Sequence, residues 1–138
     1  MVFQHTLYFT TSGRSTSNIT NEIQTIVSQS GITVGTCHVF VQHTSASLML
    51  CENADPDVRR DMETYMQYIV PDGDPMFLHQ DEGPDDMSAH IRTILTNPDL
   101  TMPVNNGQCD LGIWQGIYLW EHRTHQHQRH VIVTIQGE

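Results

Sequence analysis

The chain has 138 residues, which fits a single domain, and its 38% hydrophobic content is sufficient for one core. The formal net charge is -10 and every basic residue is an arginine, so the chain lacks the basic surface that binds nucleic acids or anionic lipids. We therefore expect neither nucleic acid nor membrane as a partner, and the few arginines become candidates for holding a small phosphorylated ligand.

The N-terminal segment has no basic stretch followed by an apolar one, and no apolar run approaches the length of a membrane span. The three cysteines, Cys37, Cys51 and Cys109, have no metal-like spacing. We interpret them as small buried hydrophobic residues in a reducing compartment and expect a cytoplasmic protein.

The first half of the chain is predicted to hold three extended segments and a helix. Residues 3–10 alternate between apolar and other side chains, which predicts a strand. Apolar residues at helical spacing predict a helix over 19–30 that ends at Gly31. The β-branched residues of 32–42 predict a strand, and 46–51 continue as a second extended piece.

The middle of the chain is predicted to hold two helices around an irregular loop. Asp55 and Pro56 are typical of a helix start, and the helix is expected to run to about Val70. The following stretch is rich in Pro, Gly and Asp and predicts a loop. Apolar residues four apart then predict a short helix over 86–95.

Three strand-like segments complete the chain, over 100–104, 108–123 and 129–136. The last two are expected to form a hairpin. With about seven strands, about three helices and no alternation of strand and helix, the class is α+β. We expect a mainly antiparallel, sandwich-like sheet in a single compact domain over residues 1–138.

Nine histidines are many for this length, and several stand beside carboxylates or hydroxyls. His43 lies at a strand end, His79 and His90 bracket an acidic loop, and His122 follows Glu121. Imidazoles mixed with carboxylates suit a divalent metal site or general acid–base catalysis. For any one of these histidines alone, a surface or hydrogen-bonded side chain is the simpler interpretation, whereas the set as a whole favours a functional site.

The acidic loop "HQDEGPDDMSAH" carries four acids between two histidines. Asp86 or Ser88 is expected to cap the helix that follows, but capping explains only one carboxylate. Glu121 follows the apolar residues of its strand and is expected to have either a raised pKa or a basic partner, namely Arg123 or Arg129. On the helix after Pro56, we expect Arg59 to pair with Glu63.

Several long motifs occur in order along the chain. They are "QHTSASL", "ENADPDVRRDM", "VPDGDP", "EGPDDMSAHI", "GIWQGIYLWEHR" and the final "QGE". Together they resemble the YjbQ-like proteins, also described as secondary thiamine-phosphate synthase enzymes. The resemblance implies a compact α+β domain that assembles as a homotrimer. It also implies a weak activity that joins hydroxymethylpyrimidine diphosphate to thiazole phosphate and releases pyrophosphate.

The family's motif residues coincide with most of the groups selected by their chemistry. The residues expected in a site are His43, Asp86 and Glu121 for catalysis, Thr44, Ser45, Gln115 and Arg123 for substrate phosphate, and His79, His90 and His122 for a divalent metal, zinc or magnesium. Glu82 also falls on the family pattern. The alternative is a non-catalytic trimer that binds a metal or metabolite and acts in regulation.

Overall fold

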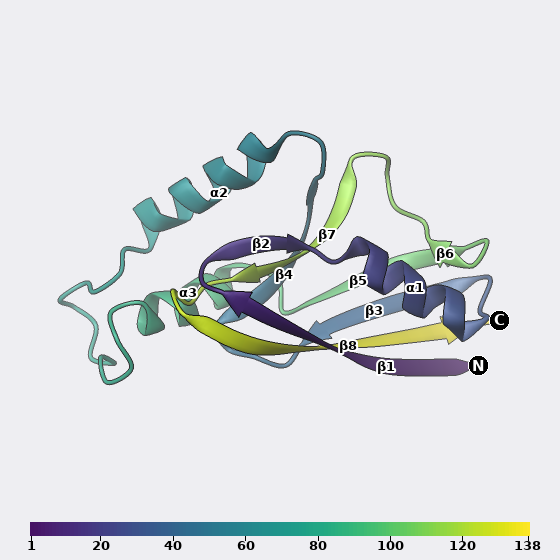
Figure 1. The fold of residues 1–138 in the computed structure, drawn as a ribbon, viewed down its shortest axis with the longest axis horizontal. Helices are drawn as coiled ribbons and strands as arrows, with labels where there is room; N and C mark the ends of the chain where they lie inside the picture. The colour runs from purple at the N-terminus through teal and green to yellow at the C-terminus, as the bar shows by residue number, and fades with distance from the viewer.

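The computed structural model describes residues 1–138, whose strands form two antiparallel sheets (Figure 1). The larger sheet has five strands in the order β1-β8-β3-β5-β6, and the smaller has three in the order β2-β7-β4. The bounds are β1 Val2–Ser12, β2 Ser15–Asn18, β3 Gly35–Val41, β4 Ala46–Glu52, β5 Asp99–Asn105, β6 Gln108–Cys109, β7 Gln115–Glu121 and β8 Gln126–Gly137. The α+β class and the antiparallel pairing are confirmed.

Three helices begin and end where local chemistry allows. They are α1 Thr20–Ser30, α2 Pro56–Ile69 and α3 Asp86–Leu95. Gly31 ends α1 with a left-handed φ of 72°, and Asp55 caps α2 by accepting a hydrogen bond from the Asp57 amide. None of the three is long and apolar enough to cross a membrane.

Two hydrophobic clusters divide the molecule into layers. The first lies between the two sheets and α1, and includes Val39 and Val133 of the large sheet and Leu119 of the small one. The second lies on the opposite face of the small sheet, where Tyr118 and Trp120 pack with apolar residues of α2. Because alternate residues of β7 enter different clusters, this strand is buried on both faces. The small sheet is therefore the middle layer, with α2 outside it (Figure 1).

The predicted C-terminal hairpin is wrong. The predicted segment 108–123 consists of two strands, β6 and β7, separated by residues 110–114. β7 pairs with β2 and β4, whereas β8 pairs with β1 and β3 in the other sheet. Strand β2 was not predicted because its four residues are all polar and show no alternation of apolar and polar side chains. The chain crosses between the sheets at residues 122–125, and this crossing places several candidate site residues.

Candidate metal and acid–base site

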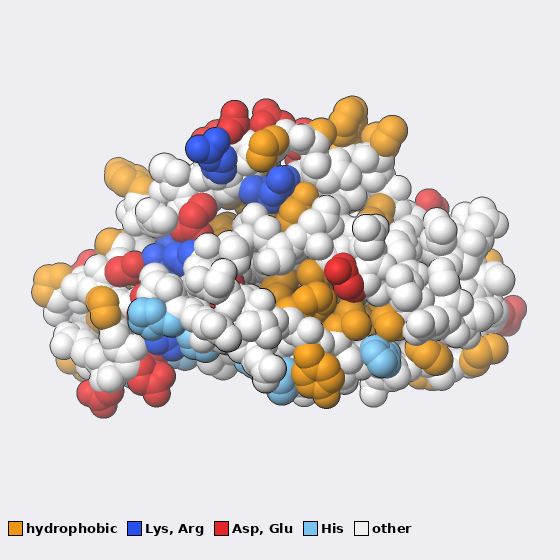
Figure 2. All heavy atoms as spheres, viewed as in Figure 1, with side chains coloured by type: hydrophobic (Ala, Val, Ile, Leu, Met, Phe, Trp, Pro, Cys, Tyr) orange, Lys and Arg blue, Asp and Glu red, His pale blue; other side chains and the backbone are white.

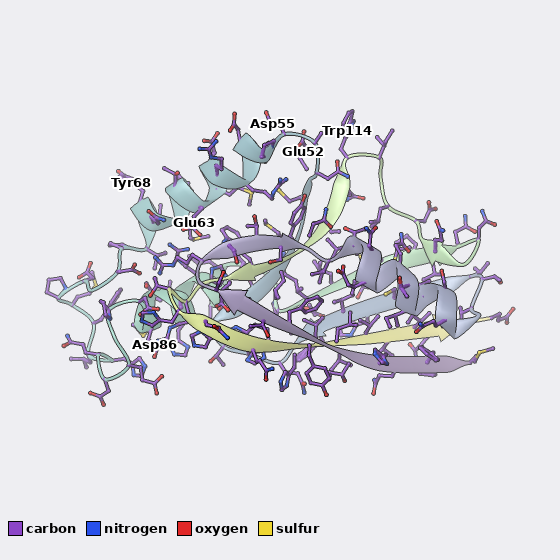
Figure 3. The ribbon with its side chains drawn as sticks, in the orientation of Figure 1. Glu52, Asp55, Glu63, Tyr68, Asp86 and Trp114 are labelled. Atoms are coloured by element: carbon purple, nitrogen blue, oxygen red, sulfur yellow. The ribbon has the colours of Figure 1, made fainter.

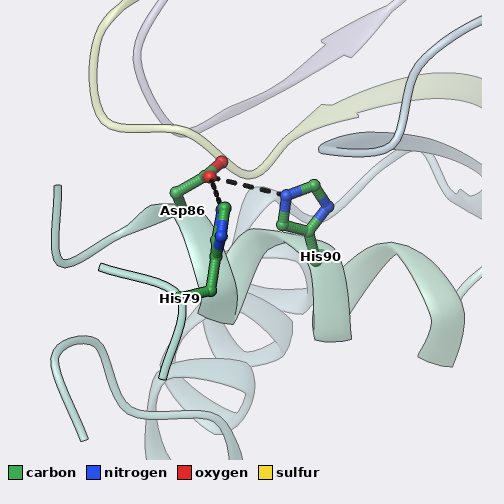
Figure 4. Close-up of side chains that lie close together, drawn as sticks. All are labelled: His79, Asp86 and His90. Carbon is green, nitrogen blue, oxygen red and sulfur yellow. Dashed lines mark hydrogen bonds and ion pairs between the residues drawn. The ribbon is translucent and has the colours of Figure 1, made fainter. Parts of the chain in front are cut away.

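His79, Asp86 and His90 form one compact cluster (Figure 4). Each offers one ligand atom, and these atoms all lie within 4.8 Å of one another. Asp86 Oδ2 is 2.5 Å from His79 Nε2 and 3.5 Å from His90 Nε2. Two imidazoles and one carboxylate are a ligand set that zinc and other divalent transition metals accept, with further positions left for water or substrate.

The first turns of α3 hold the cluster together. Asp86 and His90 are four residues apart and share one helix face, while His79 reaches the same point from the preceding loop. His90 Nδ1 lies 3.1 Å from the carbonyl oxygen of Thr44. A carbonyl can only accept, so Nδ1 carries the proton and Nε2 of a neutral His90 presents a lone pair to Asp86. A divalent cation bound between these two atoms would be coordinated by both, whereas a protonated Nε2 would instead form an ion pair with Asp86.

Arg123 supports the carboxylates from the crossing between the sheets. Its Nη1 donates to Asp86 Oδ1 at 2.8 Å, its Nε to Asp85 Oδ2 at 2.9 Å, and its Nη2 to the Glu82 carbonyl at 2.9 Å. Burial alone would raise the pKa of Asp86. The hydrogen bond from His79 and the charge of Arg123 outweigh burial and hold this pKa below its usual range. Asp86 is therefore an anion that is ready to bind a cation at neutral pH.

A pocket of about 290 Å³ opens beside His79. Its wall includes Asp74 and Phe77 from the loop before α3, together with Met87 of α3. A cavity of this size next to potential ligands suits a small molecule. Of the residues that line the pocket, only His79 was among the predicted site residues, although the motif "VPDGDP" that supplies Asp74 was part of the family resemblance.

Glu121 was expected to have either a raised pKa or a basic partner, and the structure gives it a basic partner, Arg129. Arg129 Nε donates to Glu121 Oε1 at 2.7 Å, and Arg129 Nη2 donates to Oε2. Thr11 Oγ1 and the Arg123 amide complete the shell at 2.6 and 3.0 Å. Although burial opposes ionisation, these donors lower the pKa of Glu121. With 1% exposure, the carboxylate ties β1, β7 and β8 together and has no open face.

The side chains of His43 and Ser45, in the segment after β3, form hydrogen bonds within the protein and are not free to bind a ligand. His43 Nε2 accepts from the His130 amide at 2.8 Å, and burial and the charge of Arg129 lower the His43 pKa. Ser45 Oγ accepts from Arg129 at 3.0 Å. The Thr44 side chain is exposed, and its backbone carbonyl faces His90.

Two predicted site residues lie apart from the cluster. His122 is fully buried, its Nε2 is 2.8 Å from Ser47 Oγ, and it is not one of the clustered ligands. Burial and nearby arginines lower its pKa to about 3, so it is neutral at neutral pH. Gln115 begins β7 while Glu121 ends it, which separates them by roughly 20 Å at the usual rise of a strand. Gln115 instead accepts from the Gly112 amide.

Asp85 is a structural member of the site that the sequence did not single out. It is 3% exposed and accepts from Arg123 Nε and from the Thr124 amide, both at 2.9 Å. Asp85 holds the position before α3 but makes no side-chain cap hydrogen bond. The expected capping by Asp86 or Ser88 is also wrong, because the Asp86 carboxylate contacts His79 and Arg123 and the Ser88 hydroxyl donates to the Asp85 carbonyl. Only the three-dimensional return of residues 123–124 to the acidic loop explains why two adjacent aspartates are present.

The fold and the cluster together define a two-sheet α+β protein with a candidate two-histidine, one-carboxylate centre. A family model described as UPF0047 protein YjbQ-like matches residues 5–138. The chain therefore belongs to the UPF0047 family of YjbQ-like proteins, and the resemblance drawn from its motifs is confirmed to that extent.

Relatives extend this assignment over the full length. The chain is 48% identical to a UPF0047 protein of Synechocystis sp., covering 98% of this chain and 92% of that one. It is 42% identical to the UPF0047 protein YjbQ of Escherichia coli O157:H7, covering all of both. A crystal structure of a YbjQ-like protein of unknown function from Sulfolobus solfataricus matches with a TM-score of 0.86 at 26% identity, covering 100% of both chains.

Proposed function

We propose that this protein is a small metal-assisted enzyme that acts on a phosphorylated small molecule. The observation that carries the proposal is the His79, Asp86 and His90 cluster, in which the contact of His90 Nδ1 with the Thr44 carbonyl turns Nε2 toward the Asp86 carboxylate. A divalent cation, either zinc or magnesium, fits this donor set. Two imidazoles favour zinc over magnesium, which prefers oxygen ligands and retained water.

The bound cation would polarise a phosphoryl oxygen or a leaving group, while the chain's own residues position it. Asp86 and the two histidines would hold the ion, and Arg123 and Asp85 would fix Asp86. The pocket beside His79 would hold the substrate. Every nitrogen of the Arg123 guanidinium already donates to an acidic-loop oxygen, so we assign Arg123 a positioning role first.

More specifically, we propose a weak thiamine-phosphate synthase activity that couples hydroxymethylpyrimidine diphosphate to thiazole phosphate. The motif resemblance supports it, and so does a site where a cation could stabilise departing pyrophosphate. We also propose a cytoplasmic location, which is supported by three free, buried cysteines.

A homotrimer is the assembly that we propose for this enzyme. Large apolar side chains on α2 and α3 are exposed: Tyr68 and Ile94 by 82% and Leu95 by 57%. Tyr68 projects from α2 at the outer surface of the molecule (Figure 3). Exposed apolar groups of this size support an interface, and light scattering of the purified chain would test the stoichiometry.

The test is elemental analysis of protein purified without a His-tag or nickel column, followed by turnover assays. We expect one zinc or other divalent ion per chain in the wild type, and loss of at least tenfold in metal affinity for His79→Ala and His90→Ala. His125→Ala, at an exposed histidine away from the cluster, is the matched control.

The outcomes separate the two functions that the sequence left open. Metal binding with turnover of a pyrimidine diphosphate that His79→Ala abolishes supports the enzyme. Stoichiometric metal and ligand-induced stabilisation without turnover of any phosphorylated substrate would favour the regulatory trimer. Equal metal content in the wild type and both variants would contradict the assigned ligands.

A further inference from the structure

A second pocket, lined by arginines, lies between β2 and α2 and is separate from the metal cluster. Its volume is about 410 Å³, and apart from Pro56 its lining residues are polar or charged. We call it the arginine pocket, and its defining residues are Arg14, Ser15, Thr16, Arg59, Arg60 and Glu63. Three of the chain's six basic residues therefore meet in one hollow of a protein whose net charge is -10. Basic side chains are visible beside α2 on this face (Figure 2).

Two acidic side chains near this pocket, Glu63 and Asp72, are already paired with arginines. Glu63 accepts from the fully buried Arg92 at 2.9 and 3.0 Å, and also from the Trp120 indole. Asp72 holds Arg14 through two hydrogen bonds of 2.7 Å. The expected pairing of Arg59 with Glu63 is replaced by that of Arg92, which leaves Arg59 without a carboxylate partner.

Two guanidinium groups remain to supply positive charge. Arg59 donates one hydrogen bond of 2.9 Å to the Glu52 carbonyl and stacks on Tyr118 at 4.7 Å, contacts that fix its plane without cancelling its charge. Arg60 has only an exposed 3.3 Å contact with Asp57, which is worth little in water. Thr16 adds a hydroxyl from β2, an edge strand with one unpaired side.

We propose that the arginine pocket binds the phosphate groups of a small polyanionic ligand. Guanidinium forks match phosphate oxygens in geometry as well as charge. The site needs no metal, so it stands independently of the proposed enzyme activity. Inorganic pyrophosphate is the simplest probe that can span two arginines.

The experiment is calorimetric titration of the full chain, treated with chelator, with inorganic pyrophosphate. We expect saturable binding below about 1 mM, weakened about tenfold by Arg60→Gln and further by adding Arg59→Gln. Arg60→Lys keeps the charge and is expected to retain most of the affinity. Asn105→Asp on β5 makes the same net charge change at an exposed position outside the pocket and is expected to bind as the wild type does.

Each outcome decides for or against the pocket. Equal weakening by Arg60→Gln and Asn105→Asp would reduce the effect to net charge and overturn the proposal, as would no saturable binding up to about 10 mM. His90→Ala is expected to bind pyrophosphate normally. Loss of binding in that variant would assign the anion to the metal cluster and would also overturn the proposal. The separate proposal that His79, Asp86 and His90 bind a metal would not be contradicted by that result.

Discussion

Replacing Glu121 by glutamine is expected to lower stability sharply, because it leaves Arg129 buried without a counter-charge. The two side chains are 1% and 3% exposed and are joined by two hydrogen bonds. Removing one partner of a buried ion pair costs roughly 3–5 kcal/mol. That is a large share of the roughly 5–15 kcal/mol by which a domain is stable.

The same loss can be expressed as a melting temperature. At about 2.1 cal/mol/K per residue, 138 residues give an unfolding entropy of roughly 0.29 kcal/mol/K. A loss of 3–5 kcal/mol then lowers Tm by about 10–17 °C. Calorimetry and urea unfolding at pH 7 measure it, with Glu82→Gln as the control, since the Glu82 side chain is 69% exposed.

A double-mutant cycle with Arg129→Gln isolates the pair. Removing both charges relieves the stranded guanidinium, so we expect the double variant to lose at least about 1 kcal/mol less than the sum of the single losses. Because the pKa of Glu121 is lowered by folding, its contribution is present above the unfolded pKa of about 4.3 and fades as pH falls through the folded value. The gap between wild type and Glu121→Gln must therefore narrow in acid. An additive cycle with a loss under about 1 kcal/mol would refute this reasoning.

Two further predictions concern buried ionisable groups. His122, with its pKa lowered to about 3 by burial, is expected to stay neutral in NMR titration from pH 7.5 down to about 4, and a transition near pH 6 would contradict its buried position. Asp85→Asn is expected to cost about 2–3 kcal/mol in urea unfolding at neutral pH, because Asp85 accepts charge-assisted and backbone hydrogen bonds. Since folding lowers the Asp85 pKa, that difference must shrink below about pH 4, and a difference that persists there would count against the assignment.

The helices were the most predictable elements because their signals are local. Asp55 and Pro56 start α2 as expected, and Gly31 ends α1 in the left-handed conformation that favours glycine. The pairing of β7 and β8 could not be predicted in the same way. Both strands read as apolar segments joined by a short polar turn, and only packing decides that they enter different sheets.

The candidate site likewise has some residues that the sequence could predict and others whose roles depend on distant contacts. His79 and His90 were predicted as metal ligands and Asp86 as a catalytic acid, and the structure brings all three together. The spacing of four residues on α3 places Asp86 and His90 on one helix face, a signal that the predictions did not use. The roles of Glu121 and His122 did not follow from the sequence. Each residue sits beside chemistry-bearing neighbours in sequence, yet each is sealed by contacts from distant segments, through Arg129 and Ser47.

The crossing from β7 to β8 explains why so many polar residues are buried in one place. The crossing begins with His122 and Arg123, which are buried, and reaches the surface only at Thr124 and His125. The polar atoms of the buried pair must therefore find partners within the protein. The Arg123 guanidinium finds its partners in the carboxylates of Asp85 and Asp86. The same contact that satisfies the crossing also ionises Asp86 and aims it at His79 and His90. The stability of the fold and the readiness of the candidate metal site therefore depend on one guanidinium, and a loss at Arg123 should weaken both together.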